Sequence, residues 1–187
     1  MRDDELKWRT DSVETLIKTP VFDLLRQNER AAGGLTGSYI ALDAPDCVVI
    51  IPEYEGRFVL VRQWRHGADM LTTEFPGGVV NKGEEPKAAA LRELAEETGY
   101  VAGKLTLIGS SNPNPALFKS RFYVFLASDL TPTGRQHLDA DELVECITRP
   151  VDEVISALGS GEYVHAFMGT ALAFYLRRTL FGKEEER

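Results

Sequence analysis

The chain has 187 residues, 43% of them apolar and 27% charged, which is typical of one globular domain with a sizeable core and an added N-terminal subregion. Its formal net charge of −8 argues against a general nucleic-acid binder, because no basic stripe is present to neutralise a phosphate backbone. No stretch approaches the length of an apolar membrane span, and the first residues are charged and lack a signal region, so no membrane partner is expected.

The two cysteines, Cys47 and Cys146, both lie in apolar, strand-like surroundings. We expect buried free thiols; a disulfide or a metal pair is the alternative. Free thiols persist in reducing compartments, so a cytoplasmic location is expected.

The first 45 residues are predicted to form extended strands. Pro20 interrupts the apolar pattern of residues 8–28, which favours two short strands over one helix. Three glycines within residues 31–37 predict a turn, and a further strand is expected at 39–42. We therefore treat residues 1–45 as an N-terminal strand region.

Strands and helices alternate in the rest of the chain. Strands are expected at residues 47–51, 57–64, 104–110, 121–127 and 143–148. Loops are expected at Pro76-Gly77-Gly78, at 112–115 and at 129–141, and helices at 87–98, 151–158 and 163–181. This order predicts a mixed α/β or α+β sandwich, with residues 46–182 as the main domain and 183–187 as a charged tail.

The stretch from Gly78 to Tyr100 joins a glycine-containing loop to a helix that Gly99 ends. Glu93, Glu96 and Glu97 are three and four residues apart, so their carboxylates share one side of this helix. A hard divalent cation, with Mg²⁺ the usual choice beside phosphate, would relieve their mutual repulsion. The alternative is a solvated acidic face.

The complete spacing is more specific than the glutamates alone. Gly78 is followed after five residues by Glu84, and after seven more by Arg92-Glu93-Leu94-Ala95-Glu96-Glu97-Thr98-Gly99-Tyr100. This pattern resembles the Nudix box at every position. The resemblance implies a Nudix-type α/β/α sandwich with a mixed sheet plus extra N-terminal antiparallel strands. It also implies hydrolysis of a nucleoside diphosphate linked to another group, with Mg²⁺, or alternatively Mn²⁺, bound by Glu93, Glu96, Glu97 and the Gly77 carbonyl.

Other features resemble the ADP-ribose pyrophosphatase branch of that family. Pro115 lies sixteen residues after Gly99, and Gln63-Trp64-Arg65 resembles a segment that precedes the box. The resemblance implies that the N-terminal strands form a homodimer, and that Arg62 and Arg65 hold the diphosphate of a nucleoside diphosphate sugar. Glu74 resembles a glutamate near the metals or substrate. Either arginine could instead be an edge-strand charge, and Trp64 could stack on a base or pack at a subunit contact.

The resemblance places the general base in a late acidic loop, which here is 139–145. Glu142 is the expected base, with Asp141 and Glu145 as alternatives, and a merely solvated loop remains open. Arg92 is expected to orient the glutamates, including Glu96, by a paired hydrogen bond to a carboxylate. The alternative is an ordinary surface arginine in an ion pair with a residue four positions away. Glu84 is assigned either to the site or to the helix N-terminus.

Residues 112–115, Asn-Pro-Asn-Pro, depart from the glycine-containing loop of that branch, so the identity of the terminal sugar of the substrate stays open. Two other hypotheses also stay open: a Nudix hydrolase of a triphosphate, dinucleoside polyphosphate or NADH, and a non-catalytic binding module. His66, His137 and His165 lack zinc-like spacing, so no zinc site is expected.

Overall fold

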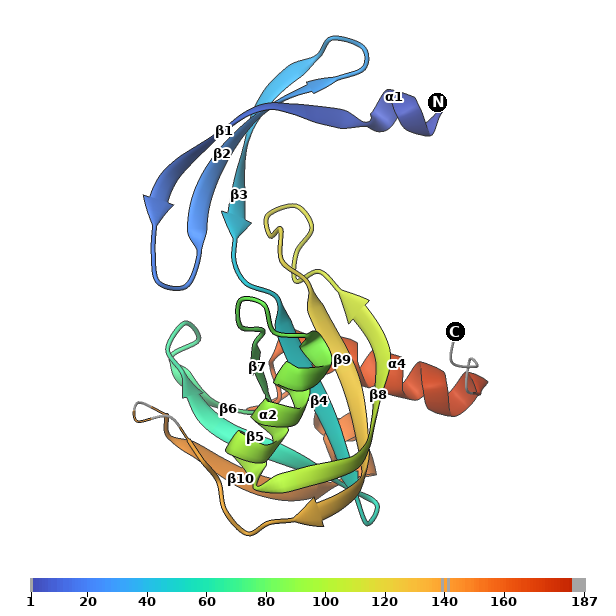
Figure 1. The fold of residues 1–187 in the computed structure, drawn as a ribbon. Helices are drawn as coiled ribbons and strands as arrows, with labels where there is room; N and C mark the ends of the chain where they lie inside the picture. The colour runs from blue at the N-terminus through green and yellow to red at the C-terminus, as the bar shows by residue number, and fades with distance from the viewer. Residues whose placement is uncertain (1, 139, 141, 183–187) are drawn as a thin grey trace. The chain divides into compact units, whose positions relative to one another are not determined.

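The computed structural model describes residues 2–138, 140 and 142–182. The chain divides into two compact units (Figure 1). Unit 1 comprises Met1–Pro45 and Asn112–Arg121, and unit 2 comprises Asp46–Ser111 and Phe122–Arg187. The sequence analysis had not associated residues 112–121 with the N-terminal region. The predicted charged tail, 183–187, lies outside the described residues.

Unit 1 is built on an antiparallel sheet of three strands in the order β1-β2-β3. It contains α1 (Asp3–Leu6), β1 (Trp8–Lys18), β2 (Asp23–Ala31) and β3 (Thr36–Asp43). The returning segment 112–121 is joined to β3, because Leu42 N donates to Leu117 O at 2.8 Å and Lys119 N donates to Leu42 O at 3.0 Å. Asn112 closes this segment by donating its side-chain amide to the carbonyls of Phe118 and Ser120.

Unit 2 contains a seven-stranded sheet with the main order β10-β5-β4-β9-β8, to which β6 adds beside β5 and β7 beside β4. The strands are β4 (Cys47–Tyr54), β5 (Arg57–Arg65), β6 (Met70–Glu74), β7 (Gly77–Val79), β8 (Tyr100–Ser111), β9 (Phe122–Pro132) and β10 (Val144–Pro150). β4 runs parallel to β9, and the other pairs are antiparallel. The sheet is therefore mixed, as predicted.

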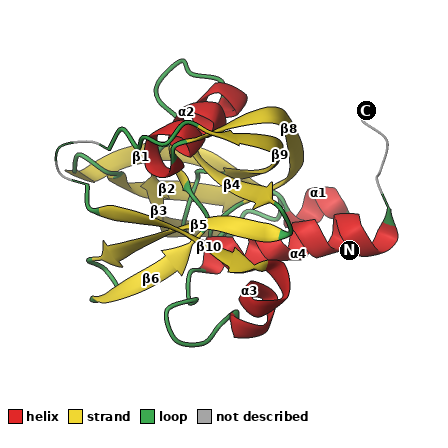
Figure 2. Cartoon of the chain, turned by 90° about the horizontal axis from the view of Figure 1, so that it is seen from below, coloured by secondary structure: helices red, strands yellow, loops and turns green. Residues whose placement is uncertain are grey.

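Helices cover both faces of this sheet (Figure 2). They are α2 (Pro86–Thr98), α3 (Val151–Ala157) and α4 (Ala166–Phe181). Side chains alternate along β4, so Val48 and Ile50 pack on the α2 side while Val49 and Ile51 pack on the α3 and α4 side. Leu94, fully buried on α2, contributes about 1.5–3 kcal/mol by leaving water. The predicted α+β sandwich with extra N-terminal strands is confirmed.

Four sequence-based expectations need correction. Gly77–Val79, predicted as loop, forms the short strand β7 because its backbone pairs with β4. The polar loop expected from residue 129 begins later, since β9 continues to Pro132 beside β8. The helix expected from residue 163 begins at Ala166, where the His165 ring nitrogen caps it. Cys47 and Cys146 form no disulfide in the described part of the chain, in line with the predicted thiols, but both are only partly buried.

Candidate active site

The centre of the candidate site is the junction of β7 and α2. Pro86 occupies the first turn of α2, where its missing N–H costs nothing, and Gly99 ends the helix with a left-handed φ of 69°. Ala89, Ala90 and Leu94 bury one side of the helix against the sheet. Packing of that side fixes which way the glutamates on the adjoining side point.

Two glycines let the chain pass close to neighbouring atoms. A Cβ on Gly77 would stand 2.2 Å from the Val48 carbonyl oxygen, which is backbone and cannot give way. A Cβ on Gly78 would stand 2.2 Å from Oε1 of Glu93. Glycine is therefore required at position 77 by the approach of β7 to β4, whereas a side chain at position 78 would displace the carboxylate of Glu93.

Arg92 holds several acidic groups at once. Its Nε and Nη2 donate to the two carboxylate oxygens of Glu84, each at 3.0 Å. Nη1 donates to Glu93 at 2.8 Å and to Glu96 at 3.1 Å, and Nη2 also donates to the Val79 carbonyl at 3.1 Å. The hydrogen bonds from Arg92 lower the pKa of Glu84 to about 2, and those to Glu84 raise the pKa of Arg92. The guanidinium thereby fixes the positions of three carboxylates.

Glu97 is the most buried of the box glutamates, with 4% of its surface exposed. Its Oε2 accepts a hydrogen bond from Gly77 N at 2.8 Å. Burial, with repulsion from Glu93 and Glu142, raises the pKa of Glu97 to about 8, and burial also raises the pKa of Glu93. The positive charges nearby thus do not balance the negative charges of Glu93 and Glu97. A bound cation would favour the ionised form of both carboxylates.

The oxygen donors fit a hard divalent cation better than zinc, because no cysteine or histidine belongs to the set. Within the described part of the chain, no three acidic, histidine or cysteine side chains converge on one point as ion ligands do. Glu93 and Glu96 face Arg92, whereas Glu97 faces Gly77. The carboxylates are close neighbours whose side chains would have to turn toward a shared ion.

A second charged cluster lies across β5 and β6. Arg65 Nε and Nη2 donate to the two oxygens of Glu74 at 2.7 and 2.8 Å, and Thr72 Oγ1 donates at 2.6 Å. His165 Nε2 lies 3.4 Å from Glu74 Oε2, while its Nδ1 accepts from Phe167 N. Burial works to raise the pKa of Glu74, yet the hydrogen bond from Arg65 and the charge of Arg65 lower it overall.

Burial lowers the pKa of His165, so the neutral ring is favoured. Because Nδ1 accepts from backbone, the proton of the neutral ring is on Nε2, which faces Glu74. Glu74 is 3% exposed and receives all these donors, so its charge is well held. It therefore fixes the orientation of Arg65, whose side chain is 41% exposed.

This cluster lines a cavity of about 280 Å³. Arg65, Glu74 and His165 provide its polar part, and Gly77 and Gly78 of β7 border it. The remaining wall is largely apolar and consists of Cys47, Val48, Val49, Phe75, Val79, Phe167 and Met168. A cavity with an apolar wall and a few placed polar groups is typical of a small-molecule site.

The other predicted residues are distributed over several places. Arg62 is three residues from Arg65 on β5, so it leaves the opposite face and pairs with Glu162 at 2.9 Å and Glu145 at 3.8 Å. Trp64 is 46% exposed on the same strand. Pro115 belongs to unit 1. These three assignments stay predictions.

In the acidic loop, Glu142 is exposed, and its charge contributes to the pKa shifts of Arg65, Glu93 and Glu97. The charge of Glu142 therefore acts on residues of both clusters. Asp139 and Asp141, the other acidic residues of this loop before Glu142, lie outside the described residues.

Sequence reasoning missed two contributors to these clusters, Thr72 and His165. Thr72 is 2% exposed and resembles any strand threonine in the sequence. His165 lies about 90 residues after Glu74, and only folding brings them together. No spacing signal could have found either residue; the one local hint was the position of His165 just before an apolar helix.

A mixed sheet between helices, with a carboxylate-bearing helix following a glycine strand, is the α+β sandwich that the sequence predicted. The sequence profile described as the NUDIX domain matches residues 43–167. The chain belongs to this family and is a Nudix hydrolase.

Relatives match over nearly the whole chain. The chain is 31% identical over 171 residues to the ADP-ribose pyrophosphatase of Bacillus subtilis (strain 168), covering 90% of this chain and 92% of that protein. It is 26% identical over 174 residues to the ADP compounds hydrolase NudE of Escherichia coli (strain K12), covering 92% of each. A solved crystal structure of an ADP compounds hydrolase superposes with a TM-score of 0.82 at 25% identity, over 96% of this chain and 97% of that one.

Across the described residues, no helix combines the length and apolar character that crossing a membrane requires.

Proposed function

We propose that the protein hydrolyses the pyrophosphate bond of ADP-ribose or a related nucleoside diphosphate sugar, with Mg²⁺ or alternatively Mn²⁺, giving a nucleoside monophosphate and a sugar phosphate. The observation that carries this proposal is the position of the β7 glycines, which border both the box glutamates and the cavity of Arg65 and Glu74. The names of the relatives from B. subtilis and E. coli support the same substrate class.

Glu93, Glu96, Glu97 and the Gly77 carbonyl are the groups that would hold the metal. When bound, the metal supplies positive charge to the non-bridging phosphate oxygens and lowers the pKa of a coordinated water. Arg92 holds Glu93 and Glu96 through Nη1, so it limits the positions that these two carboxylates sample. We assign Arg92 to orientation of the metal-binding carboxylates rather than to substrate contact.

Glu142 is the proposed general base. It would take a proton from water as the water oxygen forms a bond to one phosphorus and the bond from that phosphorus to the bridging oxygen breaks. The bridging oxygen leaves with the other phosphate, so the products are two monoesters. Two observations support this role: Glu142 is exposed, and its charge contributes to the pKa shifts of Glu93 and Glu97.

Arg65 is the proposed diphosphate contact. Glu74 binds its Nε and Nη2, which fixes the plane of the guanidinium. The adjoining cavity would take one end of the substrate, with Phe167 and Phe75 as apolar wall. We retain Arg62, Trp64 and Pro115 as further substrate contacts, and for Trp64 packing at a subunit contact stays the alternative.

We also propose that residues 1–45 form a homodimer contact. Unit 1 exposes several large apolar side chains, including Val13 at 53% and Ile17 at 55%. Burying them against a second copy would gain about 25 cal/mol per Å² of apolar surface. Two cysteine thiols that form no disulfide in the described residues fit the reducing environment of the cytoplasm, which is the proposed location.

The test is turnover with Mg²⁺ across ADP-ribose, GDP-mannose, UDP-glucose, ADP-glucose, NADH and a nucleoside triphosphate. Added phosphatase releases inorganic phosphate from the monoester products. We expect preference for ADP-ribose or another diphosphate sugar. Activity only on the triphosphate or NADH would contradict the substrate class, and no activity on any compound would favour a binding module.

A further inference from the structure

The C-terminal end of α2 is contacted by the five residues that follow β9, Thr133 to His137, which we call the clamp. The last carbonyls of a helix have no donor within the helix itself. Here Gly99 O accepts from Thr133 N at 2.7 Å, Glu97 O from Gln136 Nε2 at 2.5 Å, and Glu96 O from His137 N at 2.9 Å. In Figure 1 the chain after β9 passes this end of α2.

The geometry of Gly99 provides an independent sign of this close approach. A Cβ at position 99 would stand 2.8 Å from the carbonyl oxygen of Arg135, in the middle of the clamp. The φ of 69° separately disfavours any side chain there. The final glycine of the box is thus required by contact with the clamp as well as by the helix end.

Gln136 is the clamp residue that reaches furthest. Its side-chain Nε2 donates to Glu97 O and lies 3.4 Å from Val144 O, at the first residue of β10. Val144 follows Glu142 by two residues. One amide group therefore contacts both the last turn of α2 and the strand that begins just after the acidic loop.

The residues held by the clamp are those to which the site is assigned. Glu96 and Glu97 offer their backbone carbonyls to the clamp and their carboxylates to the site. The charge of Glu142 contributes to the pKa shift of Glu97. The clamp thus connects the backbone of the helix that bears the metal-binding carboxylates with the segment that bears the base.

We propose that Gln136 is a positioning residue, which sets the location of Glu142 relative to Glu96 and Glu97 by holding α2 and β10 together. This inference rests on the proposed function, because it assumes that Glu142 acts as the base. A displacement of about 1 Å at a reacting group can cost about 10²-fold in rate, so a single lost amide contact has a measurable effect.

The experiment compares Gln136→Met, which keeps the length and removes the donor, with Gln136→Lys, which restores a donor to the carbonyls. A lysine is also favourable at a helix C-terminus. We expect Gln136→Met to lower kcat about 10- to 100-fold with little change in KM, and Gln136→Lys to recover most of kcat. Gln27→Met in unit 1 is the matched control and should retain wild-type kcat.

A second readout is independent of activity. Hydrogen exchange of the Thr133 and His137 amides should become faster in Gln136→Met and not in Gln27→Met. An unchanged kcat in Gln136→Met, or a Gln136→Lys as slow as Gln136→Met, would overturn the positioning role. If the wild-type protein hydrolyses no compound of the panel, the proposed function fails, and unchanged His137 exchange in Gln136→Met would separately overturn the clamp.

Discussion

The two units of the molecule are built in different ways. Unit 2 covers both faces of a mixed sheet with helices and buries side chains such as Ile50, Leu60 and Leu94 completely. Among the described residues of unit 1, only Leu25, Ala41 and Ser120 are buried, and large side chains including Val13 and Ile17 are more than half exposed. Unit 2 has a core of its own, whereas unit 1 is a three-stranded sheet with very little core.

This difference indicates which unit can hold charged side chains in a fixed orientation. A charged side chain can be held in one orientation when packed backbone surrounds it, as Glu97 and Glu74 are in unit 2. An exposed sheet offers apolar area and strand edges, which suit association with another chain. We therefore assign the proposed metal ligands and general base to unit 2 and association to unit 1, and the following substitutions test this division.

The largest effect is expected for Glu97→Gln. Loss of a proposed metal-binding carboxylate should lower kcat on the order of 10³-fold or more. The fold should persist, because the neutral side chain suits a buried position where burial raises the pKa of Glu97 to about 8, and it can still accept from Gly77 N. Steady-state turnover and circular dichroism measure the two outcomes.

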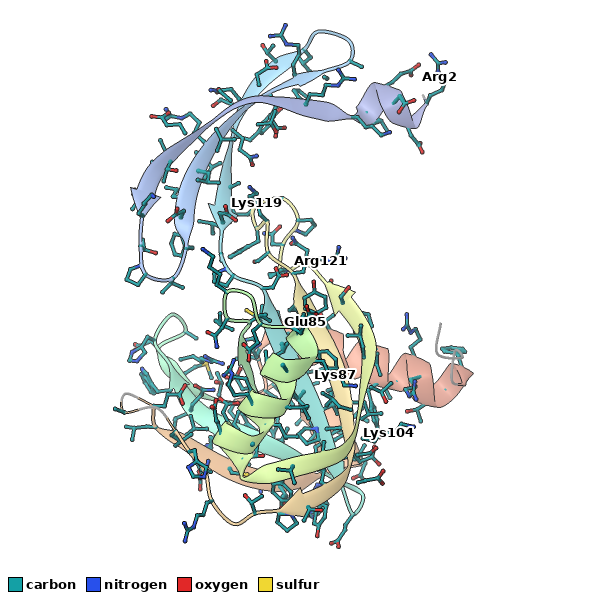
Figure 3. All side chains as sticks on the ribbon, in the orientation of Figure 1. Arg2, Glu85, Lys87, Lys104, Lys119 and Arg121 are labelled. Atoms are coloured by element: carbon teal, nitrogen blue, oxygen red, sulfur yellow. The ribbon has the colours of Figure 1, made fainter. Side chains whose placement is uncertain are left out.

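The control for this substitution is Glu85→Gln, at the exposed N-terminal end of the same helix (Figure 3). It should retain wild-type kcat. Turnover by Glu97→Gln at the wild-type rate would contradict the proposal that this helix binds the metal.

A smaller effect is expected for Arg92→Lys. A lysine keeps the charge but cannot form the forked contact to Glu84 while also bonding Glu93 and Glu96. We expect kcat to fall about 10- to 100-fold and the Mg²⁺ concentration for half-maximal rate to rise, as is usual for residues that support metal ligands. Titration of turnover with Mg²⁺ measures both, and Arg178→Lys on α4 is the control. An unchanged Mg²⁺ requirement would contradict the orienting role.

Glu74→Gln should affect stability as well as activity. The substitution weakens the paired contact with Arg65 in a site that is 3% exposed, so we expect a loss of about 1–3 kcal/mol in the free energy of unfolding. Denaturant unfolding measures it, and Glu153→Gln on the surface of α3 is the control. A loss no larger than that of the control would show that the pair does not hold the cluster together.

The same residue predicts a pH dependence. The folded pKa of Glu74 lies below its ordinary value of 4.5, so the unfolded state binds this proton more tightly. The stabilisation by Glu74 is complete above pH 4.5 and is lost as the pH falls through the lowered folded pKa. Glu74→Gln should therefore flatten the acid limb of stability against pH; an acid limb identical to wild type would contradict this assignment.

The smallest effect on stability is expected in unit 1. Introducing lysine at Val13 and Ile17 should abolish the proposed dimer but change the unfolding free energy of unit 2 by less than about 0.5 kcal/mol. Light scattering measures the size of the particle in solution, and circular dichroism measures the unfolding free energy. Val101→Lys on β8, where Val101 is 44% exposed, is the control and should leave the size unchanged. A wild-type protein that is already monomeric at low concentration would refute the association assigned to unit 1.

The sequence by itself determined the features that depend on neighbours in the chain. The helix that ends at Thr98 before Gly99, the spacing of Glu93, Glu96 and Glu97, and the break at Pro20 follow from helix periodicity, capping and the fixed φ of proline. The α+β class followed from the order of the elements, because each amphipathic face must be covered by another element.

Only the tertiary structure decided the contacts between distant segments. The pairing of Gly77–Val79 with β4 depends on backbone approach, which no local pattern encodes. The meeting of Glu74 with His165, and of Gln136 with Glu97 at the end of α2, joins residues about 40 to 90 positions apart. Such contacts depend on how the sheet and helices pack, and polar side chains that serve them carry no periodic signal, so the sequence located the carboxylates while the fold selected their partners.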